Sequence, residues 1–348
     1  MTSWTVRGVS SAGARFVLFP SMGEYRAYDD HVYDAFDTAD DRHRAYRDAI
    51  RAAAHGQVVV DIGTGRDALW ALVAARAGAR HVYAIEADPP TAERADEAVA
   101  SAGLSDRVTV LPGHSTEQTL PVRAEVCVSE IVGNIATAEG AIPILADAGA
   151  RLCTPDCVWI PFRMQTWAAA VDLSTTRLGL AAESLPYLRA IFETAGGPFD
   201  PRLCLAGPVD ELLISSSAAV ESVTFETGSP PVSDKGEVSL RIALGATMTG
   251  LLLWARVAVS QRGGREVDCL AGDTRAWAPV YVPLPAPRPV AKGDHITIAL
   301  DRTTSDDGIH PDYDLRLDGS PAWHGPHHGG PFRATPFYRQ LFHSAGEA

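Results

Sequence analysis

The sequence predicts an α/β nucleotide-binding domain followed by a β-rich domain. Three observations indicate this architecture. Residues 58–65 read V-V-V-D-I-G-T-G and lead into a long Ala/Leu segment that stops at Gly78, which is typical of a strand, a glycine turn and a helix. Strand-like and helix-like segments then alternate as far as about residue 151, as expected for a mostly parallel sheet. From about residue 159 the chain becomes rich in prolines and in alternating apolar and polar residues, which favours antiparallel strands.

Length, composition and charge exclude several classes of protein. The chain has 348 residues, of which 46% are hydrophobic and 21% charged, so we expect an ordinary soluble globular protein with more than one core. The net charge of −13, without any basic stripe, argues against a nucleic-acid partner and favours a small cationic substrate. The chain lacks both a signal-peptide pattern and an apolar run near 20 residues, so we expect a cytoplasmic protein without a membrane span.

The cysteines and histidines give weak indications of a metal site. The cysteines lie at 127, 153, 157, 204 and 269. They form an odd set without paired C-x-x-C motifs, which is typical of reduced thiols in a cytosolic protein. A zinc site through Cys153 and Cys157 would need a second ligand pair that the sequence does not offer. His324, His327 and His328 fit a metal site or, more simply, a surface turn, so we expect no metal.

The segment before the glycine turn is predicted to contain an amphipathic helix. The run F-V-L-F at 16–19 fits a short strand or a packing segment. Further along, apolar residues at 45, 46, 49, 50 and 53 recur at helical spacing, with Asp40 or Asp41 placed to cap the helix start. Arg42 would lie in the first turn, where a solvated side chain is the simplest interpretation of its residue type.

Acidic residues follow successive strands of the α/β domain. Asp61 ends the first strand, and Glu86 ends the second strand 25 residues later, where its carboxylate can accept hydrogen bonds from both hydroxyls of a ribose. Glu86 could instead cap the strand, but its interval from the glycine turn favours ribose binding. Glu117 and Glu130 follow later strands. Because the carboxyl ends of parallel strands meet at one edge of a sheet, we expect all four acids at the ligand-binding edge.

A loop with two glutamates follows the strand that ends at Ser129. Residues 129–140 read S-E-I-V-G-N-I-A-T-A-E-G, which sets Glu130 and Glu139 among apolar and small residues. Carboxylates in such surroundings need a cation. The alternative is that one acid caps the following helix, near 140–151, and that the other is solvated.

Taken together, these motifs resemble the protein arginine methyltransferases. The matching segments are D-I-G-T-G at 61–65, A-I-E at 84–86, H-S-T-E at 114–117, and S-E with a second acid nine positions after the first. The pattern is most similar to the monomethylating, type III branch. The resemblance is good over about 24–166 and looser beyond.

The resemblance implies a three-part organisation. Residues 1–56 would form an N-terminal helical segment that covers the cofactor. Residues 57–162 would form a Rossmann-like class I methyltransferase domain, and residues 163–348 a β-barrel-like domain. A helical dimerisation arm would occupy about 174–205, where the sequence also has a helical pattern over 174–196, and it would make the protein a homodimer.

The resemblance also implies S-adenosyl-L-methionine as the cofactor and S-adenosyl-L-homocysteine as the product. The residues that would bind it are Tyr33, Phe36, Arg42, Asp61, Gly63, Gly65, Glu86, Ser115, Thr116 and Glu117. Arg42 would pair with the cofactor's carboxylate, contrary to the solvated interpretation above. Phe36 replaces the family's usual methionine, and Asp67 stands near the place where a third glycine is common.

Glu130 and Glu139 would then be the catalytic pair that clamps a guanidinium, and Trp277 of the barrel domain would contribute to the substrate pocket. The family has a histidine before this tryptophan that supports the double-glutamate loop, whereas this chain has Ala276. What replaces that support is left open.

The leading substrate hypothesis is free L-arginine, methylated once on a terminal guanidine nitrogen in a bacterial natural-product pathway, as in the biosynthesis of streptozotocin-type N-nitroso compounds. Arginine in a protein or peptide is the alternative. A further alternative, from another class of function, is a catalytically silent scaffold that binds the cofactor without turnover.

Overall fold

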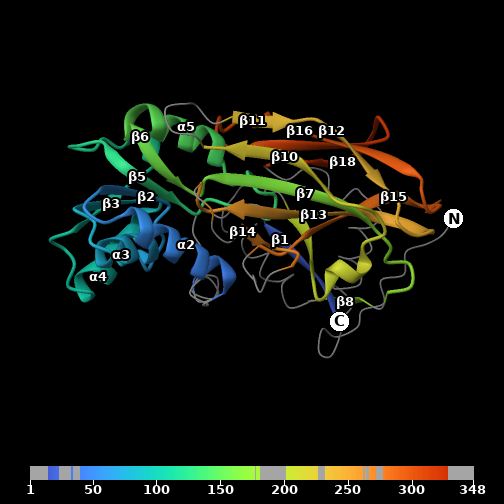
Figure 1. Cartoon of the computed structure of the whole chain (residues 1–348), viewed down its shortest axis with the longest axis horizontal. Helices are drawn as coiled ribbons and strands as arrows, with labels where there is room; N and C mark the ends of the chain where they lie inside the picture. Colours follow the sequence, from blue (N-terminus) through green and yellow to red (C-terminus); the bar gives the residue numbers. More distant parts are fainter. Residues whose placement is uncertain are drawn as a thin grey trace.

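The structure is a computed structural model. It describes residues 15–22, 33, 40–176, 178–180, 201–225, 232–261, 263, 266–271 and 277–327. An α/β domain and a β-barrel-like domain lie end to end along the longest axis of the molecule (Figure 1). The predicted fold class is therefore confirmed, with the sheet of the first domain parallel and that of the second domain almost entirely antiparallel.

The α/β domain contains five parallel strands in the order β4-β3-β2-β5-β6. The strands are β2 (Val58–Ile62), β3 (His81–Glu86), β4 (Val108–Pro112), β5 (Ala124–Ser129) and β6 (Cys153–Ile160). The helices are α2 (Asp41–Ala53), α3 (Leu69–Arg76), α4 (Pro89–Ser101) and α5 (Ala141–Arg151), with a short 3₁₀ helix, η1 (Ser115–Glu117), before β5. The chain starts in the middle of the sheet at β2, moves outward to β4, and then crosses back to β5. This reversal between β2 and β5 is the place where sheets of this type bind ligands.

Local sequence explains where the helices begin. Asp40 is the N-cap of α2, and its carboxylate accepts a 2.8 Å hydrogen bond from the His43 N–H. Asp88 caps α4 in the same way through the Thr91 N–H, and Pro89 follows at the first helical position, where its missing N–H costs nothing. All five residues of β2 are buried, as expected for a central parallel strand covered on both faces.

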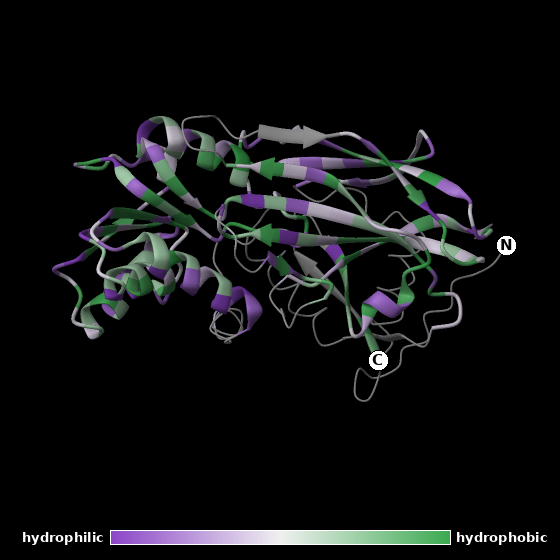
Figure 2. Ribbon diagram, viewed as in Figure 1, coloured by the Kyte–Doolittle hydropathy of each residue, from purple (hydrophilic) through white to green (hydrophobic). Residues whose placement is uncertain are grey.

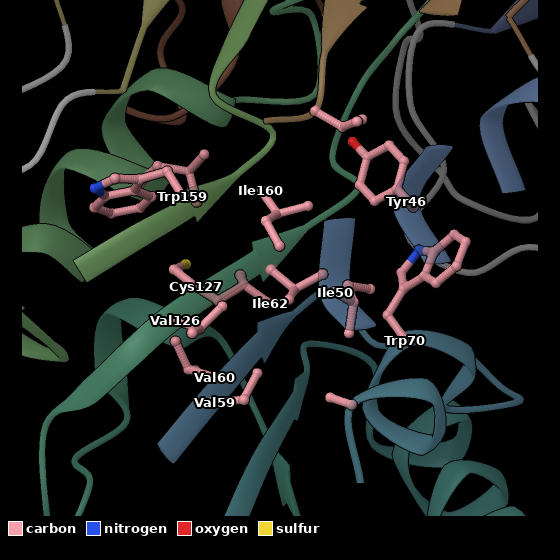
Figure 3. Close-up of a cluster of buried hydrophobic side chains, with 14 of the residues drawn as sticks. Tyr46, Ile50, Val59, Val60, Ile62, Trp70, Val126, Cys127, Trp159 and Ile160 are labelled. Atoms are coloured by element: carbon pink, nitrogen blue, oxygen red, sulfur yellow. The ribbon is translucent and has the colours of Figure 1, made fainter. Parts of the chain in front are cut away.

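Buried side chains from both faces of the sheet form one large core. In Figure 3, Tyr46 and Ile50 of α2 lie over Ile62 of β2, while Cys127 of β5 and Trp159 of β6 continue the cluster. The same cluster extends into the barrel domain, and its members there include Met164, Trp254 and Trp277. The two domains therefore share a continuous apolar interface.

The barrel domain consists of two sheets. The larger runs β11-β10-β7-β13-β15-β9-β1-β8, with β14 paired to β13, and the smaller runs β12-β16-β17-β18. The strands of the larger sheet are β1 (Phe16–Met22), β7 (Arg163–Val171), β8 (Leu178–Leu180), β9 (Pro201–Ala206), β10 (Ala218–Thr224), β11 (Val232–Lys235), β13 (Ala246–Ala258), β14 (Glu266–Asp268) and β15 (Val280–Val290). Those of the smaller sheet are β12 (Glu237–Arg241), β16 (His295–Thr304), β17 (Pro311–Leu317) and β18 (Ser320–Gly325), and a short 3₁₀ helix, η2 (Val209–Leu212), precedes β10. Hydrophilic and hydrophobic residues alternate along several of these strands, which is the expected pattern for strands with one face in a core (Figure 2).

Two segments differ from the expected organisation. β1 pairs with β8 and β9, so the start of the chain contributes a strand to the barrel sheet rather than only a helical segment beside the first domain. The helix expected over 174–196 is wrong at 178–180, where the chain forms β8. Residues 181–200, which hold most of the expected dimerisation arm, lie outside the described residues. Within the part of the chain that the structure describes, no helix is long and apolar enough to cross a membrane.

Candidate active site

The strand edge at the β2–β5 crossover carries a buried carboxylate. Asp61 is fully buried, and its Oδ2 accepts a 2.7 Å hydrogen bond from the Thr64 hydroxyl. Among the described residues, its Oδ1 has no hydrogen-bond partner, and neither has the buried Oγ of Ser129, one register position away on β5. Burial raises the pKa of Asp61 to about 7, although the Thr64 hydroxyl acts in the opposite sense. Two unsatisfied buried polar atoms at this edge indicate a place for a polar ligand.

The glycine turn brings its backbone close to other parts of the site. Gly63 and Gly65 have φ angles of +75° and +67°, which strain any residue with a side chain. A Cβ on Gly63 would lie 3.1 Å from Ile131, and one on Gly65 would lie 3.2 Å from the ring of Tyr33. The turn therefore packs closely against Ile131 and Tyr33, and binding of a cofactor at Gly63 and Gly65 stays a prediction.

Glu86 and Tyr33 lie on either side of this turn. Glu86 accepts hydrogen bonds from the N–H of Gly65 (2.9 Å) and of Asp88 (3.1 Å), and burial raises its pKa. The Tyr33 ring packs under the Arg66 guanidinium at 5.0 Å, while burial and the charge of Glu86 raise the pKa of Tyr33 to about 12. The two predicted cofactor ligands therefore lie together, whereas Phe36 is outside the described residues.

The segment expected beside an adenine forms η1. Ser115 is buried, and its carbonyl accepts a 2.9 Å hydrogen bond from Arg151 of α5. Thr116 is exposed, and its hydroxyl lies 2.7 Å from His114 Nδ1. Glu117 is exposed as well. Because η1 follows β4 directly, these residues lie at the same edge of the sheet as Glu86.

Glu130 already binds a guanidinium, that of Arg42. Arg42 is 1% exposed, and its Nη1 donates to Glu130 Oε1, while Glu130 Oε2 accepts a 2.7 Å hydrogen bond from the indole of Trp70. Arg42 Nε also lies 3.6 Å from Asp40. Arg42 is thus buried in the site and not solvated. Its described partners are Glu130, which follows the end of β5, and Asp40, which caps the start of α2.

Tyr46 connects the two glutamates of the loop. It is fully buried, its ring stacks on Trp70 at 5.2 Å, and its hydroxyl donates a 3.3 Å hydrogen bond to the Ser129 carbonyl. Burial raises the pKa of Tyr46 well above its usual value, and the charges of Glu130 and Glu139 raise it further. The charges of both loop glutamates therefore act on the Tyr46 hydroxyl.

A buried polar network joins the double-glutamate loop to the barrel. Thr137, in the middle of the loop, donates a 2.6 Å hydrogen bond to Glu221 of β10 and lies 3.0 Å from the Tyr313 hydroxyl. Glu221 is 3% exposed and also accepts from Thr166 (2.9 Å) and from Arg302. Thr166 Oγ1 in turn accepts a 3.0 Å hydrogen bond from the N–H of Ala136. The barrel domain thus fixes the loop through a buried carboxylate that is paired with Arg302 and accepts hydrogen bonds from two threonines.

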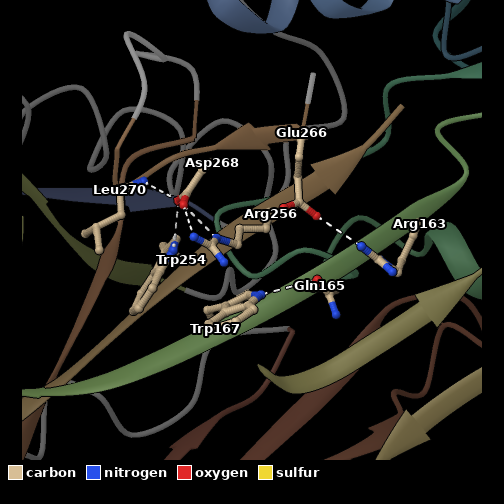
Figure 4. A network of polar contacts seen from close by, with 8 residues as sticks. All are labelled: Arg163, Gln165, Trp167, Trp254, Arg256, Glu266, Asp268 and Leu270. Carbon is tan, nitrogen blue, oxygen red and sulfur yellow. Dashed lines mark hydrogen bonds and ion pairs between the residues drawn. The ribbon is translucent and has the colours of Figure 1, made fainter. Parts of the chain in front are cut away.

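One hydrogen bond links the segment after Trp277 to the double-glutamate loop, and a separate polar network surrounds Asp268 of β14. Trp277 is buried, and the neighbouring Ala278 carbonyl accepts a 2.7 Å hydrogen bond from Asn134 of the double-glutamate loop. Figure 4 shows that Asp268, at the end of β14, accepts from the Trp254 indole (3.1 Å) and from Arg256 Nε (2.6 Å). β14 packs against α2, so this network lies beside the helix that carries Arg42. Ala276 itself is outside the described residues.

Sequence reasoning missed Tyr46, Trp70, Thr137 and Glu221. Tyr46 and Trp70 read as ordinary apolar positions of helices, and their polar atoms gave no signal. Glu221 directly follows the buried Val220 in β10, so strand alternation would place its side chain on the opposite, solvent-facing side. All five cysteines are buried, and none of them forms a disulfide bond in the described part of the chain. Of the histidine trio, His328 lies outside the described residues, while His324 pairs with Asp314 at 2.8 Å and His327 lies 3.3 Å from Asp307.

The chain is similar in sequence to known methyltransferases. Residues 46–158 match the family model described as ribosomal protein L11 methyltransferase (PrmA). The chain is 31% identical over 225 residues to protein arginine N-methyltransferase 7 of Rattus norvegicus, an alignment that covers 57% of this chain and 32% of the relative. It is 35% identical over 139 residues to protein arginine N-methyltransferase PRMT10 of rice (Oryza sativa subsp. japonica), which covers 38% of this chain and 36% of the relative. The aligned regions thus span about a third of the length of these curated relatives.

Solved structures show the same fold. Arabidopsis thaliana protein arginine methyltransferase 10 superimposes with a TM-score of 0.63 at 18% identity, covering 86% of this chain and 97% of that one. A Trypanosoma brucei PRMT1 enzyme-prozyme heterotetrameric complex with AdoHcy gives a TM-score of 0.62 at 18% identity, covering 81% and 92%. In sequence and in fold, this chain is similar to the protein arginine N-methyltransferases.

Proposed function

We propose that this chain is an S-adenosyl-L-methionine-dependent N-methyltransferase that transfers one methyl group to a terminal guanidine nitrogen of arginine. The observations that support the proposal are that Glu130 and Glu139 belong to one loop, which follows β5 at the edge of the sheet, and that the charges of both act on the buried Tyr46 hydroxyl. Glu130 already holds a guanidinium, that of Arg42, so its surroundings suit this cation.

The residues at the strand edge fit the proposed cofactor. The buried Asp61 Oδ1, which lacks a partner among the described residues, suits a donor such as an ammonium or hydroxyl group, and the turn at Gly63 and Gly65 offers close backbone approach. Glu86 would hold ribose hydroxyls, Tyr33 would cover the ligand, and η1 would lie beside the adenine. Once bound, the cofactor would supply an electrophilic methyl group on a sulfonium.

In this proposal the two glutamates position the substrate. Guanidinium has a pKa above 12 and is a poor nucleophile when protonated, so its charge must be held away from the attacking nitrogen. Glu130 and Glu139 would each accept charge-assisted hydrogen bonds from the group and fix one nitrogen in line with the methyl group. The attacking nitrogen would lose a proton to one of the two carboxylates, which would later release that proton to solvent. Positioning is the larger contribution, since proton transfer by itself gives about 10²–10⁴-fold.

The ion pair between Arg42 and Glu130 would determine which ligand binds first, the cofactor or the substrate. Its guanidinium occupies Glu130 Oε1, and Trp70 occupies Oε2. A carboxylate on the cofactor would attract Arg42, and its departure would free Glu130 for the substrate. We therefore propose that the cofactor binds first.

Free L-arginine is our leading substrate, used in a bacterial natural-product pathway, and protein or peptide arginine is the alternative. The net charge of −13 and the sequence R-A-W at 275–277, without the family's histidine, support a departure from a broad protein modifier. The names of the curated relatives support the alternative equally well. A homodimer through residues 174–205 and a cytoplasmic location remain predictions.

The test is a time course with labelled cofactor, in which products from free arginine and from an arginine-rich peptide are separated by mass. We expect a single methyl group on free arginine. Glu130→Gln should abolish turnover without weakening cofactor binding, because a neutral amide competes less than the carboxylate for Arg42. Glu97→Gln, the same exchange at an exposed position of α4, is the matched control and should retain full activity.

The outcomes separate the hypotheses. Rapid methylation of the peptide alone would exclude the free-arginine hypothesis while leaving arginine methylation intact. Full activity in Glu130→Gln would overturn the role of the clamp. Cofactor binding by the wild type without turnover on any guanidine compound would favour a silent scaffold.

A further inference from the structure

We infer that Asp307, His310 and His327 form a binding site for a divalent transition metal of the zinc class. The site lies at the turn between β16 and β17, beside the double-glutamate loop. It is independent of the methyl-transfer chemistry proposed above.

The three side chains present a suitable set of donor atoms. One ligand atom from each residue lies within 4.8 Å of the other two. Asp307 Oδ2 contacts His310 Nδ1 and lies 3.3 Å from His327 Nε2, so the two imidazoles approach the same oxygen. Two imidazoles and one carboxylate are a frequent zinc ligand set, and three protein ligands leave a position for water.

The carboxylate is oriented by its own turn. Asp307 Oδ1 accepts hydrogen bonds from the Ser305 hydroxyl (2.8 Å), the Ile309 N–H (2.8 Å) and the His310 N–H (2.9 Å). These bonds occupy one oxygen and direct the other toward the histidines. Such hydrogen bonds to a ligating carboxylate are the outer contacts that orient metal ligands.

The histidines are positioned by the rest of the hairpin. The turn is closed by a 2.8 Å hydrogen bond from the Ser305 N–H to the His310 carbonyl. His327, which comes from beyond β18, is held by a 2.7 Å bond from its N–H to Asp312 of β17. The two rings stack at 4.1 Å with an angle of 12° between their planes. The stacking keeps both rings beside Asp307, so one nitrogen of each ring lies near the carboxylate.

The pair of His324 and Asp314, in the same sheet, is more exposed than the proposed metal site. His324 and Asp314 form one 2.8 Å contact, and both side chains are about half exposed, at 52% and 53%. In the proposed site the exposed fractions are 12% for His310, 16% for His327 and 27% for Asp307, so an ion can enter but is shielded on most sides. The ligands also come from two separate segments, which a single surface pair does not require.

The site is next to the double-glutamate loop. A Cβ placed on Gly140, the residue after Glu139, would lie 2.6 Å from Ile309 Cγ2 and 3.4 Å from His310 Cδ2. The turn therefore packs directly on the end of that loop. A bound metal would join the turn to His327 and would make this contact more rigid.

The experiment measures metal binding by the full-length protein after treatment with a chelator and desalting. Titration calorimetry with ZnCl₂ at pH 7.5 should give one site per chain with a Kd in the micromolar range or tighter. Co²⁺ as a spectroscopic probe should give d–d bands without a thiolate charge-transfer band, which separates this site from the cysteines. His310→Ala and His327→Ala should each weaken Zn²⁺ binding at least about tenfold.

His324→Ala is the matched control and should bind Zn²⁺ as the wild type does. Thermal unfolding in the presence of chelator checks that each variant is folded, and the second histidine variant carries the test if the first does not fold. Zn²⁺ should raise the Tm of the wild type and of His324→Ala but not that of His327→Ala. Absence of binding in the wild type, equal binding by all variants, or a cobalt–thiolate band would overturn the proposal.

Discussion

The contact between Thr137 and Glu221 allows a sharp test of how the barrel domain supports the active site. Thr137→Val keeps the shape of the side chain and removes only the hydroxyl. That hydroxyl donates to a carboxylate at 2.6 Å and lies 3.0 Å from the Tyr313 hydroxyl, and it is fully buried. A hydrogen bond to a charged group contributes about 1.5–3 kcal/mol, so we expect a loss of about 2 kcal/mol in the free energy of unfolding.

Because the lost bond lies in the middle of the double-glutamate loop, activity should fall more than cofactor binding. If the whole loss of about 2 kcal/mol in stability came from the positioning of Glu130 and Glu139, the activation barrier would rise by the same amount and kcat would fall about 30-fold. The assay is steady-state methylation of arginine, with cofactor affinity measured separately by calorimetry. We expect the cofactor Kd to change less than threefold.

Thr249→Val is the matched control for this test. Thr249 is also fully buried, and its hydroxyl accepts a 2.9 Å hydrogen bond from the Leu173 N–H and donates a 3.2 Å bond to the Val171 carbonyl. It lies in β13 of the barrel, and its partners lie outside the loop. We expect a similar loss of stability with little change in kcat. Equal kcat values for the two variants, at equal loss of stability, would refute a positioning role for Thr137.

Two further predictions concern single residues. Because burial raises the pKa of Asp61 to about 7 from an ordinary value of about 3.9, the folded protein holds a proton between these pH values that the unfolded chain has lost, so the free energy of unfolding should fall as the pH rises from 4 to 7. Full ionisation of Asp61 should lower the free energy of unfolding of the cofactor-free protein by on the order of 4 kcal/mol. Asp61→Asn should remove this contribution to the pH dependence of stability, which thermal melts at pH 5, 6, 7 and 8 would detect. The same pH dependence in the wild type and the variant would contradict the assignment. Trp70→Phe should keep the stacking on Tyr46 but remove the 2.7 Å hydrogen bond to Glu130. We therefore expect kcat to fall about tenfold while the cofactor Kd stays unchanged. An unchanged kcat would show that this hydrogen bond does not orient the Glu130 carboxylate.

Local patterns in the sequence predicted the α/β domain well. The Asp40 cap, the β2 strand, the turn at Gly63 and Gly65, and the acid at the end of β3 depend on residues that are close in the chain, and the structure has all of them. For the second domain, residue patterns predicted only a β-rich region, and the family resemblance added the barrel. Its strand order includes β1 next to β9, a pairing of residues nearly 200 positions apart that no local pattern encodes.

The sequence by itself determined the fold class and the positions of the acids that follow the parallel strands. Turn geometry, helix caps and strand periodicity are properties of short segments, so they can be read without the fold. Only the tertiary structure decided what each acid contacts. Glu130 holds Arg42 from 88 residues away, and Thr137 in its loop is fixed by Glu221 from 84 residues away. These contacts arise where the packed domains bring distant side chains together in a buried setting, and there the cost of leaving a charge or hydroxyl unpaired selects the partner.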